Sequence, residues 1–191
     1  MKYLRLLLRL LNVKTFRQAL SLLKMLYLKK DTKYPPEVLK FEKTFAKYIG
    51  TDYALSFCNG TTSYDAALFA LDLEDGDEAL MCSMSFQSVI MTTLQSRLNI
   101  TYQDMDENLN VVLDDGQVNE RTKVIVVSHL FGYPEEMNLV RAFAKKHQLK
   151  IIEDCSHAHG ASFGNKKVGS IGDISFFSFQ GDKAVSGGEA G

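Results

Sequence analysis

From Ala54 onward, short apolar runs alternate with helical patterns, and this alternation limits the fold of the chain more than any other feature. Apolar runs at 78–82 and 123–128 have the length of buried strands, and a helical pattern at 136–147 leads into another run at 150–154. Such alternation indicates βαβ units, whose parallel strands bind ligands at their carboxyl ends. We therefore expect an α/β fold with a mostly parallel sheet flanked by helices.

A carboxylate and an amine follow two of these apolar runs. Asp154 ends the run at 150–154, and Lys183 lies just beyond a second run that begins at Ile174. Such a pair suits pyridoxal phosphate (PLP) because the carboxylate keeps the pyridine nitrogen protonated, while the amine holds the aldehyde as a Schiff base and moves protons. The pair alone also fits a surface lysine and a strand-end aspartate that never meet.

The segment upstream of the helix expected at 64–73 has the pattern of a phosphate cradle. Residues 54–57 read as a short buried strand, and the small polar turn 58–63 follows them. This order points free N–H groups and the positive helix end at an anion, and Gly60 permits close approach. Turns of this composition also cap ordinary helices. Further on, Phe86 is suited either to stack on a flat cofactor or to join the core.

Several motifs occur in the order and at the spacing of one protein family. They are the segments 41–50, 59–62, 129–134, 153–161, 168–173 and 177–179, then Lys183 with the Gly-Gly-Glu run 187–189. On these motifs the chain resembles the DegT/DnrJ/StrS family of PLP-dependent sugar aminotransferases, from about Tyr34 to Gly191. The resemblance implies a PLP-dependent transferase fold of the aspartate aminotransferase type.

The resemblance also implies a role for each matching residue. Lys183 falls on the Schiff-base lysine, and Asp154 falls on the partner of the ring nitrogen. His157 falls on the position that contacts the phenolic oxygen of the cofactor, where many members carry Gln. The remaining cofactor positions are the stacking aromatic Phe86 and the phosphate-binding residues Gly60, Thr61 and Ser178. Some relatives replace the lysine with histidine and act as dehydratases, and Lys183 argues against that branch.

The resemblance further implies a reaction and partners. We expect amino transfer, with L-glutamate as donor, to a nucleotide-linked keto sugar for cell-surface polysaccharide or secondary-metabolite synthesis. A homodimer is expected because the active site of this fold type is completed across a dimer. Alternatives are another PLP-fold enzyme, or an inactive PLP-fold fragment with a binding or regulatory role. Residues 34–191 correspond to the amino-terminal part of the large PLP-binding domain, without the carboxy-terminal domain, and we do not expect them to be active alone.

The composition of the chain bears on whether it binds nucleic acid or a metal. The chain is 46% hydrophobic and 24% charged with a net charge of −1, which suits a cytoplasmic enzyme and gives no reason to expect nucleic-acid binding. Cys58, Cys82 and Cys155 lack metal-ligand spacing, so we expect buried thiols and no metal site. His129 and His159 are interpreted as structural.

Residues 1–33 form a separate basic segment, with nine Lys or Arg and one Asp. Thr15 and Gln18 have the spacing of a capping box that opens an amphipathic helix. No uncharged run reaches the roughly 18 residues of a membrane span. The segment therefore either docks on the enzyme itself or its dimer mate, or lies peripherally on the inner membrane surface.

Overall fold

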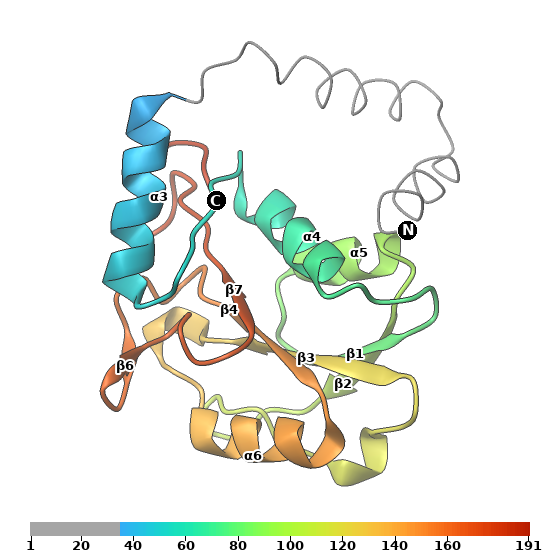
Figure 1. Cartoon of the computed structure of the whole chain (residues 1–191). Coiled ribbons are helices and arrows are strands. Elements are labelled where there is room, and N and C mark those ends of the chain that lie inside the picture. The colour runs from blue at the N-terminus through green and yellow to red at the C-terminus, as the bar shows by residue number, and fades with distance from the viewer. Residues whose placement is uncertain (1–34) are drawn as a thin grey trace, which may run out of the picture. The chain divides into compact units, whose positions relative to one another are not determined.

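The structure is a computed structural model that describes residues 35–191, of which residues 40–191 form one compact unit. The main sheet has the order β2-β1-β3-β4-β7, with all neighbours parallel (Figure 1). Its strands are β1 (Glu78–Cys82), β2 (Asn99–Gln103), β3 (Thr122–Ser128), β4 (Lys150–Asp154) and β7 (Ile174–Phe176). The helices are α3 (Pro36–Ile49), α4 (Gly60–Ala70), α5 (Gln87–Gln95) and α6 (Met137–His147). Two short strands, β5 (Ser162–Phe163) and β6 (Lys166–Lys167), pair antiparallel.

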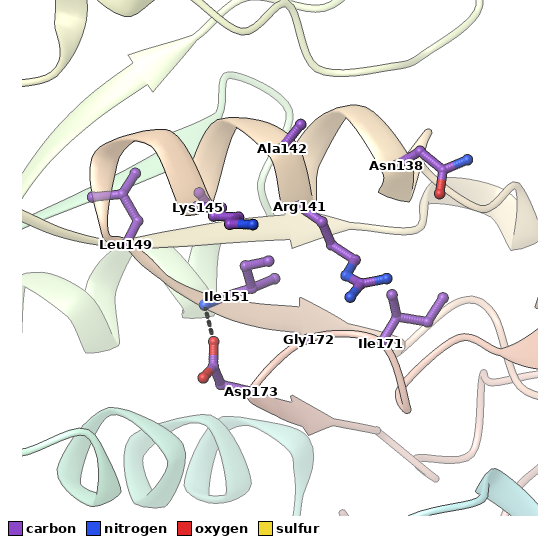
Figure 2. Close-up of a pocket in the computed structure, with 10 residues that line it drawn as sticks. Asn138, Arg141, Ala142, Lys145, Leu149, Ile151, Ile171, Gly172 and Asp173 are labelled. Atoms are coloured by element: carbon purple, nitrogen blue, oxygen red, sulfur yellow. Dashed lines mark hydrogen bonds between the residues drawn. The ribbon is translucent and has the colours of Figure 1, made fainter.

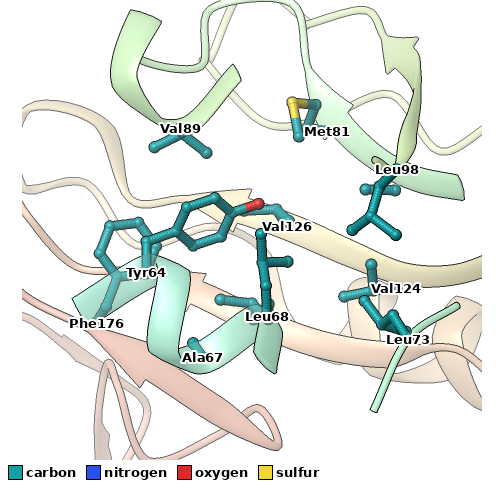
Figure 3. Packing of buried hydrophobic residues seen from close by; sticks show 12 residues of the cluster. Tyr64, Ala67, Leu68, Leu73, Met81, Val89, Leu98, Val124, Val126 and Phe176 are labelled. Carbon is teal, nitrogen blue, oxygen red and sulfur yellow. The ribbon is translucent and has the colours of Figure 1, made fainter. Parts of the chain in front are cut away.

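Helices cover both faces of the sheet, so alternate residues of one strand enter different cores (Figure 1). In β1, Met81 (Figure 3) and Ala79 pack in the core under α4 and α5, whereas Leu80 packs in the core under α6. Parallel strands covered on both faces have continuous apolar stretches, as residues 124–127 of β3 do. The predicted α/β fold with a parallel sheet is confirmed.

Helix α6 shows how the local sequence defines these elements. Met137, Val140 and Phe143 recur at helical spacing and are buried against the sheet. Basic residues fill the last turn, where they interact favourably with the negative end of the helix dipole. The helix ends at His147, and the left-handed backbone of its cap Gln148 (φ 56°) turns the chain so that Leu149 N donates back to Ala144 O at 2.8 Å.

The predicted strand at 54–57 is wrong. Within the described residues, its backbone pairing is limited to Phe57, which exchanges two hydrogen bonds with Gly191 (2.8 and 3.0 Å). Instead, the N–H and hydroxyl of Ser56 both donate to the buried Glu42 carboxylate of α3 at 2.9 Å. These bonds hold the segment beside α3 and leave it outside the sheet. Helix α4 starts at Gly60, earlier than the predicted start at residue 64.

The aromatic residues at the end of β7 and just after it belong to the core. Phe176, Phe177 and Phe179 are all buried, and Phe45 of α3 packs on Phe177 and Phe179 with ring centroids 5.0 and 5.4 Å apart. The helices described in residues 35–191 are too short or too polar to cross a bilayer. The capping box and helices predicted within residues 1–33 lie outside the described residues.

Candidate active site

A cavity of about 150 Å³ lies at the carboxyl ends of the strands. Its walls come from the start of α4 and from the segments that follow β1, β3, β4 and β7. The cavity brings together every predicted site residue, namely Gly60, Thr61, Phe86, Asp154, His157, Ser178 and Lys183. This is the edge at which open parallel sheets bind ligands.

Asp154 ends β4 and lies almost entirely out of solvent, with 7% of its surface exposed. Burial raises the pKa of its carboxyl above the usual value, and hydrogen bonds from Ser156, including one from the Ser156 N–H at 3.0 Å, act in the opposite direction. A buried carboxylate is stable only beside a partner that satisfies it. Asp154 therefore suits a protonated ring nitrogen.

Lys183 provides the amine of the cavity. Its side chain is 11% exposed, and its Nζ lies 5.7 Å from the centroid of the Phe86 ring, within cation–π range. The Asp182 carboxylate is 3.9 Å from the same nitrogen but extends into solvent. Lys183 is thus an enclosed amine beside an exposed aromatic face.

The start of α4 has the geometry of an anion cradle. Asn59 caps the helix, with Asn59 Oδ1 accepting from Thr62 N at 2.9 Å and Asn59 O accepting from Ser63 N at 3.1 Å. Within the described residues, these bonds leave the N–H groups of Gly60 and Thr61 without an intrahelical acceptor. Both N–H groups carry the positive end of the dipole and suit a phosphate.

The close approach of α4 to Ser178 requires glycine at position 60. A Cβ there would lie 2.8 Å from Ser178 Cβ and 3.3 Å from Phe177 O. Gly60→Ala should therefore lower the free energy of unfolding by about 1–3 kcal/mol, because neither neighbour is a flexible side-chain end, and should weaken PLP binding. Chemical denaturation and PLP titration measure the two effects. Gly181→Ala is the matched control, since a Cβ there meets nothing within 4 Å, and equal losses in both variants would contradict the prediction.

The cavity wall also contains groups that the sequence analysis missed. Ser128 ends β3 in register with Asp154, is buried, and its Oγ has no hydrogen-bond partner among residues 35–191. Phe131 has a left-handed backbone (φ 53°) and stacks on the His157 ring at 6.0 Å. The sequence could have indicated Ser128 as a site residue, because it lies at the carboxyl end of a predicted strand. A buried hydroxyl without a partner, together with the glycine cradle, fits a polar, phosphate-bearing group such as PLP.

Glu135, in the loop after β3, is buried and accepts a hydrogen bond from Val111 N at 3.0 Å. Burial raises the pKa of Glu135 to about 7. The folded state therefore keeps a proton that the unfolded state loses from about pH 4.5, so this stabilising contribution is present at low pH and lost as pH rises through 7.

Glu135→Gln should remove that pH dependence, because an amide does not ionise and its oxygen still accepts from Val111. Relative to the variant, the unmodified protein should lose about 3 kcal/mol of unfolding free energy between pH 4.5 and pH 8. Urea denaturation at several pH values measures this difference. Parallel profiles for the two proteins would show that Glu135 does not titrate in this range.

A wider, open groove lies elsewhere, between α6 and the segment 171–173 (Figure 2). It measures about 490 Å³, and Arg141 and Lys145 extend over a floor that includes Ile151 and Ile171. None of the predicted site residues lines this groove. The smaller cavity is the candidate active site because the chemically competent groups converge there.

Comparison with known proteins agrees with the geometry of the cavity. The model of the DegT/DnrJ/EryC1/StrS aminotransferase family matches residues 18–191. The chain belongs to this family. The match begins within the basic segment 1–33, earlier than the Tyr34 boundary of the resemblance. Membership confirms the predicted family.

Individual relatives are similar over most of the chain. A GDP-perosamine synthase of Vibrio cholerae is 32% identical, with 80% of this chain and 42% of the relative aligned. The aminotransferase of Psychrobacter cryohalolentis has a TM-score of 0.80 at 34% identity, with 94% of this chain and 47% of that chain covered. The Escherichia coli GDP-4-keto-6-deoxy-D-mannose-3-dehydratase with bound hydrated PLP has a TM-score of 0.76 at 26% identity, over 80% of this chain and 42% of that one. These likenesses confirm the PLP-dependent aminotransferase fold and agree with PLP as the cofactor.

The chain spans about two fifths of the length of the curated relatives it matches.

Proposed function

We propose that the protein transfers an amino group to the ketone of a nucleotide-linked sugar, with PLP as cofactor and L-glutamate as donor. The observation that carries this proposal is the convergence of Lys183, Asp154 and the α4 cradle on one cavity. The GDP-perosamine synthase of Vibrio cholerae and the GDP-keto-sugar dehydratase of Escherichia coli support a nucleotide sugar as the substrate class. Lys183 favours amino transfer over dehydration. Synthesis of cell-surface polysaccharide or secondary-metabolite sugars would use such a product.

PLP supplies an electron sink for the carbon that loses or gains a proton. The residues of this chain hold it and move that proton. Gly60 and Thr61 would bind its phosphate through N–H groups, with the Ser178 hydroxyl as a further donor. Phe86 would stack on its ring, and His157 would contact its phenolic oxygen.

Two groups would perform the catalytic steps. The Asp154 carboxylate would hold the proton on the ring nitrogen, and its burial strengthens that electrostatic interaction. The Lys183 Nζ would bind the cofactor at rest and, once displaced by the donor amine, would carry the proton between the substrate carbon and the cofactor carbon. The enclosed position of Lys183 limits exchange of that proton with water.

The reaction divides into two halves that can be tested separately. Mixing the PLP-loaded protein with L-glutamate should release 2-oxoglutarate without any sugar present. Subsequent addition of nucleotide-linked keto sugars, beginning with GDP-4-keto-6-deoxymannose, should return the PLP absorbance and give an amino sugar detectable by mass spectrometry. A protein that binds PLP but releases no 2-oxoglutarate and aminates no keto sugar would contradict the proposal and favour a binding or regulatory role.

A second copy of the chain is the proposed partner at the cavity mouth. Phe86 and Phe131 line the cavity and are 61% and 65% exposed, and Tyr133, two residues after Phe131, is 69% exposed. A cluster of exposed aromatic residues of this kind marks an interaction surface. Light scattering should give the mass of a homodimer, and a monomer at micromolar concentration would refute this assignment.

For residues 1–33 we propose docking on the enzyme rather than on a membrane, because the family match already includes part of this segment. Deletion of residues 1–33 should then lower the melting temperature, and the intact protein should not float with anionic vesicles. Membrane binding would instead contribute about 1 kcal/mol per basic residue and disappear at high salt. Salt-sensitive flotation with an unchanged melting temperature after deletion would overturn self-docking.

A further inference from the structure

A fully buried hydrogen-bonded pair, His129 and Glu153, lies directly beside Asp154 at the carboxyl ends of β3 and β4. His129 Nε2 is 3.0 Å from Glu153 Oε2, and both side chains are 0% exposed. Burying a carboxylate is costly unless hydrogen bonds satisfy it. The pair has no role in the proposed chemistry, so its presence needs an explanation.

The hydrogen bonds of His129 indicate which of its two ring nitrogens donates. The Glu135 N–H donates to His129 Nδ1 at 3.0 Å, so this nitrogen carries a lone pair and no proton. The proton is therefore on Nε2, which donates it to Glu153. His129, Glu153 and Cys155 are close enough together to suggest a metal site, but these bonds leave no ring lone pair on His129 to bind one.

Glu153 joins this pair to a second loop. Its Oε2 accepts from Gly169 N at 2.8 Å, and its Oε1 accepts from Ile171 N at 2.8 Å and Gly172 N at 2.6 Å. With His129, four donors surround one carboxylate. Burial acts to raise the pKa of Glu153, but these hydrogen bonds outweigh it and lower the pKa. The carboxylate is a fixed acceptor that ties the loop 169–172 to β4.

The same arrangement fixes the backbone of Asp154. The His129 N–H donates to Asp154 O at 3.0 Å, and Glu153 is the residue immediately before Asp154 on the strand. Successive residues of a strand point to opposite faces. Clamping Glu153 on one face therefore sets the direction in which the Asp154 carboxylate leaves the other face, into the cavity.

We propose that His129 and Glu153 are positioning residues, which hold the Asp154 carboxylate in line with the ring nitrogen of PLP. The inference rests on the proposed function, because it concerns the partner of that nitrogen. Small displacements of a positioned catalytic group have large effects on its interaction. His129 is among the residues that line the cavity, but its side chain is 0% exposed, and the pair acts through Asp154.

Two substitutions at His129 separate its two hydrogen bonds. His129→Gln places an amide nitrogen near the former Nε2 and can still donate to Glu153. His129→Asn places its amide near the former Nδ1, so it can accept from Glu135 N but does not reach Glu153. Glu153→Gln removes the charge and turns one acceptor into a donor that faces other donors.

The experiment loads the protein with PLP labelled with ¹⁵N in the ring and records the ring-nitrogen chemical shift, together with the dissociation constant for PLP. The unmodified protein and His129→Gln should show a protonated ring nitrogen. His129→Asn and Glu153→Gln should still bind PLP but should shift the signal toward the unprotonated form. Phe143→Leu is the control, because Phe143 lies in the core under α6 and its truncation lowers stability without touching the pair.

Wild-type signals in His129→Asn and Glu153→Gln, or an equal shift in Phe143→Leu, would overturn the inference and leave the pair a purely structural role. If His129→Asn and Glu153→Gln do not fold, Glu153→Asp tests the inference instead. This variant keeps the charge but withdraws it from His129, and the ring-nitrogen signal should again shift toward the unprotonated form. No movement in that variant would equally overturn the inference. Failure of the unmodified protein to bind PLP would instead refute the proposed function.

Discussion

Lys183→Ala is expected to abolish covalent attachment of PLP and to reduce amino transfer by about 10³-fold or more. The loss is large because the variant lacks the group that both binds the cofactor and moves the proton. The enclosed Nζ of Lys183 beside the Phe86 ring is the structural reason. The unmodified protein should be yellow, and borohydride should fix a pyridoxyl group on Lys183. Peptide mapping by mass spectrometry identifies the modified residue, and absorbance and 2-oxoglutarate release measure the loss.

Lys123→Ala is the matched control for this experiment. Lys123 lies near the amino end of β3, where its Nζ donates to Glu120 O at 2.7 Å, so it is at the opposite end of the sheet from the cavity. Its loss should leave the absorbance and turnover within about twofold, because surface substitutions rarely change more. A pyridoxyl group mapped to a lysine other than Lys183 would refute the assignment.

The sequence predicted the strands best where a strand is covered on both faces. The runs that became β1 and β4 were predicted with the bounds that the structure has. Adjacent apolar residues such as Leu80 and Met81 in β1, and Ile151 and Ile152 in β4, face opposite sides of the sheet, and helices on both sides require this pattern. The segment 54–57 has the same apolar character but is held by Glu42. That long-range contact leaves no local signal in the sequence.

The candidate site was predictable for a similar reason. Its residues follow strands, and the carboxyl ends of parallel strands meet at one edge. The role of the His129–Glu153 pair could not be predicted, because it depends on hydrogen bonds between loops. The three backbone donors to Glu153 lie 16–19 residues away from it, and such a network is visible only once the fold is assembled.

Asp154→Asn should retain bound PLP but lose turnover by about 10²-fold or more, since removal of a preorganised electrostatic partner typically costs a few kcal/mol of transition-state stabilisation. Asn preserves the shape of the side chain and removes the charge that would keep the ring nitrogen protonated. Steady-state kinetics and PLP absorbance measure the two properties. Asp182→Asn is the control, because Asp182 is also near Lys183, at 3.9 Å from its Nζ, but is exposed.

The stability of Asp154→Asn and of the unmodified protein, both without PLP, distinguishes a loss of catalysis from a loss of folding. Burial raises the pKa of Asp154, so its stabilising contribution is present at low pH and lost as pH rises from the usual aspartate value through the raised pKa. Asn cannot ionise, and the variant should therefore unfold at an equal or higher temperature than the unmodified protein at pH 8. A variant that is stable, binds PLP and turns over slowly would assign the defect to the missing charge. Near-normal turnover, or an equal loss in Asp182→Asn, would show that Asp154 is not the partner of the ring nitrogen.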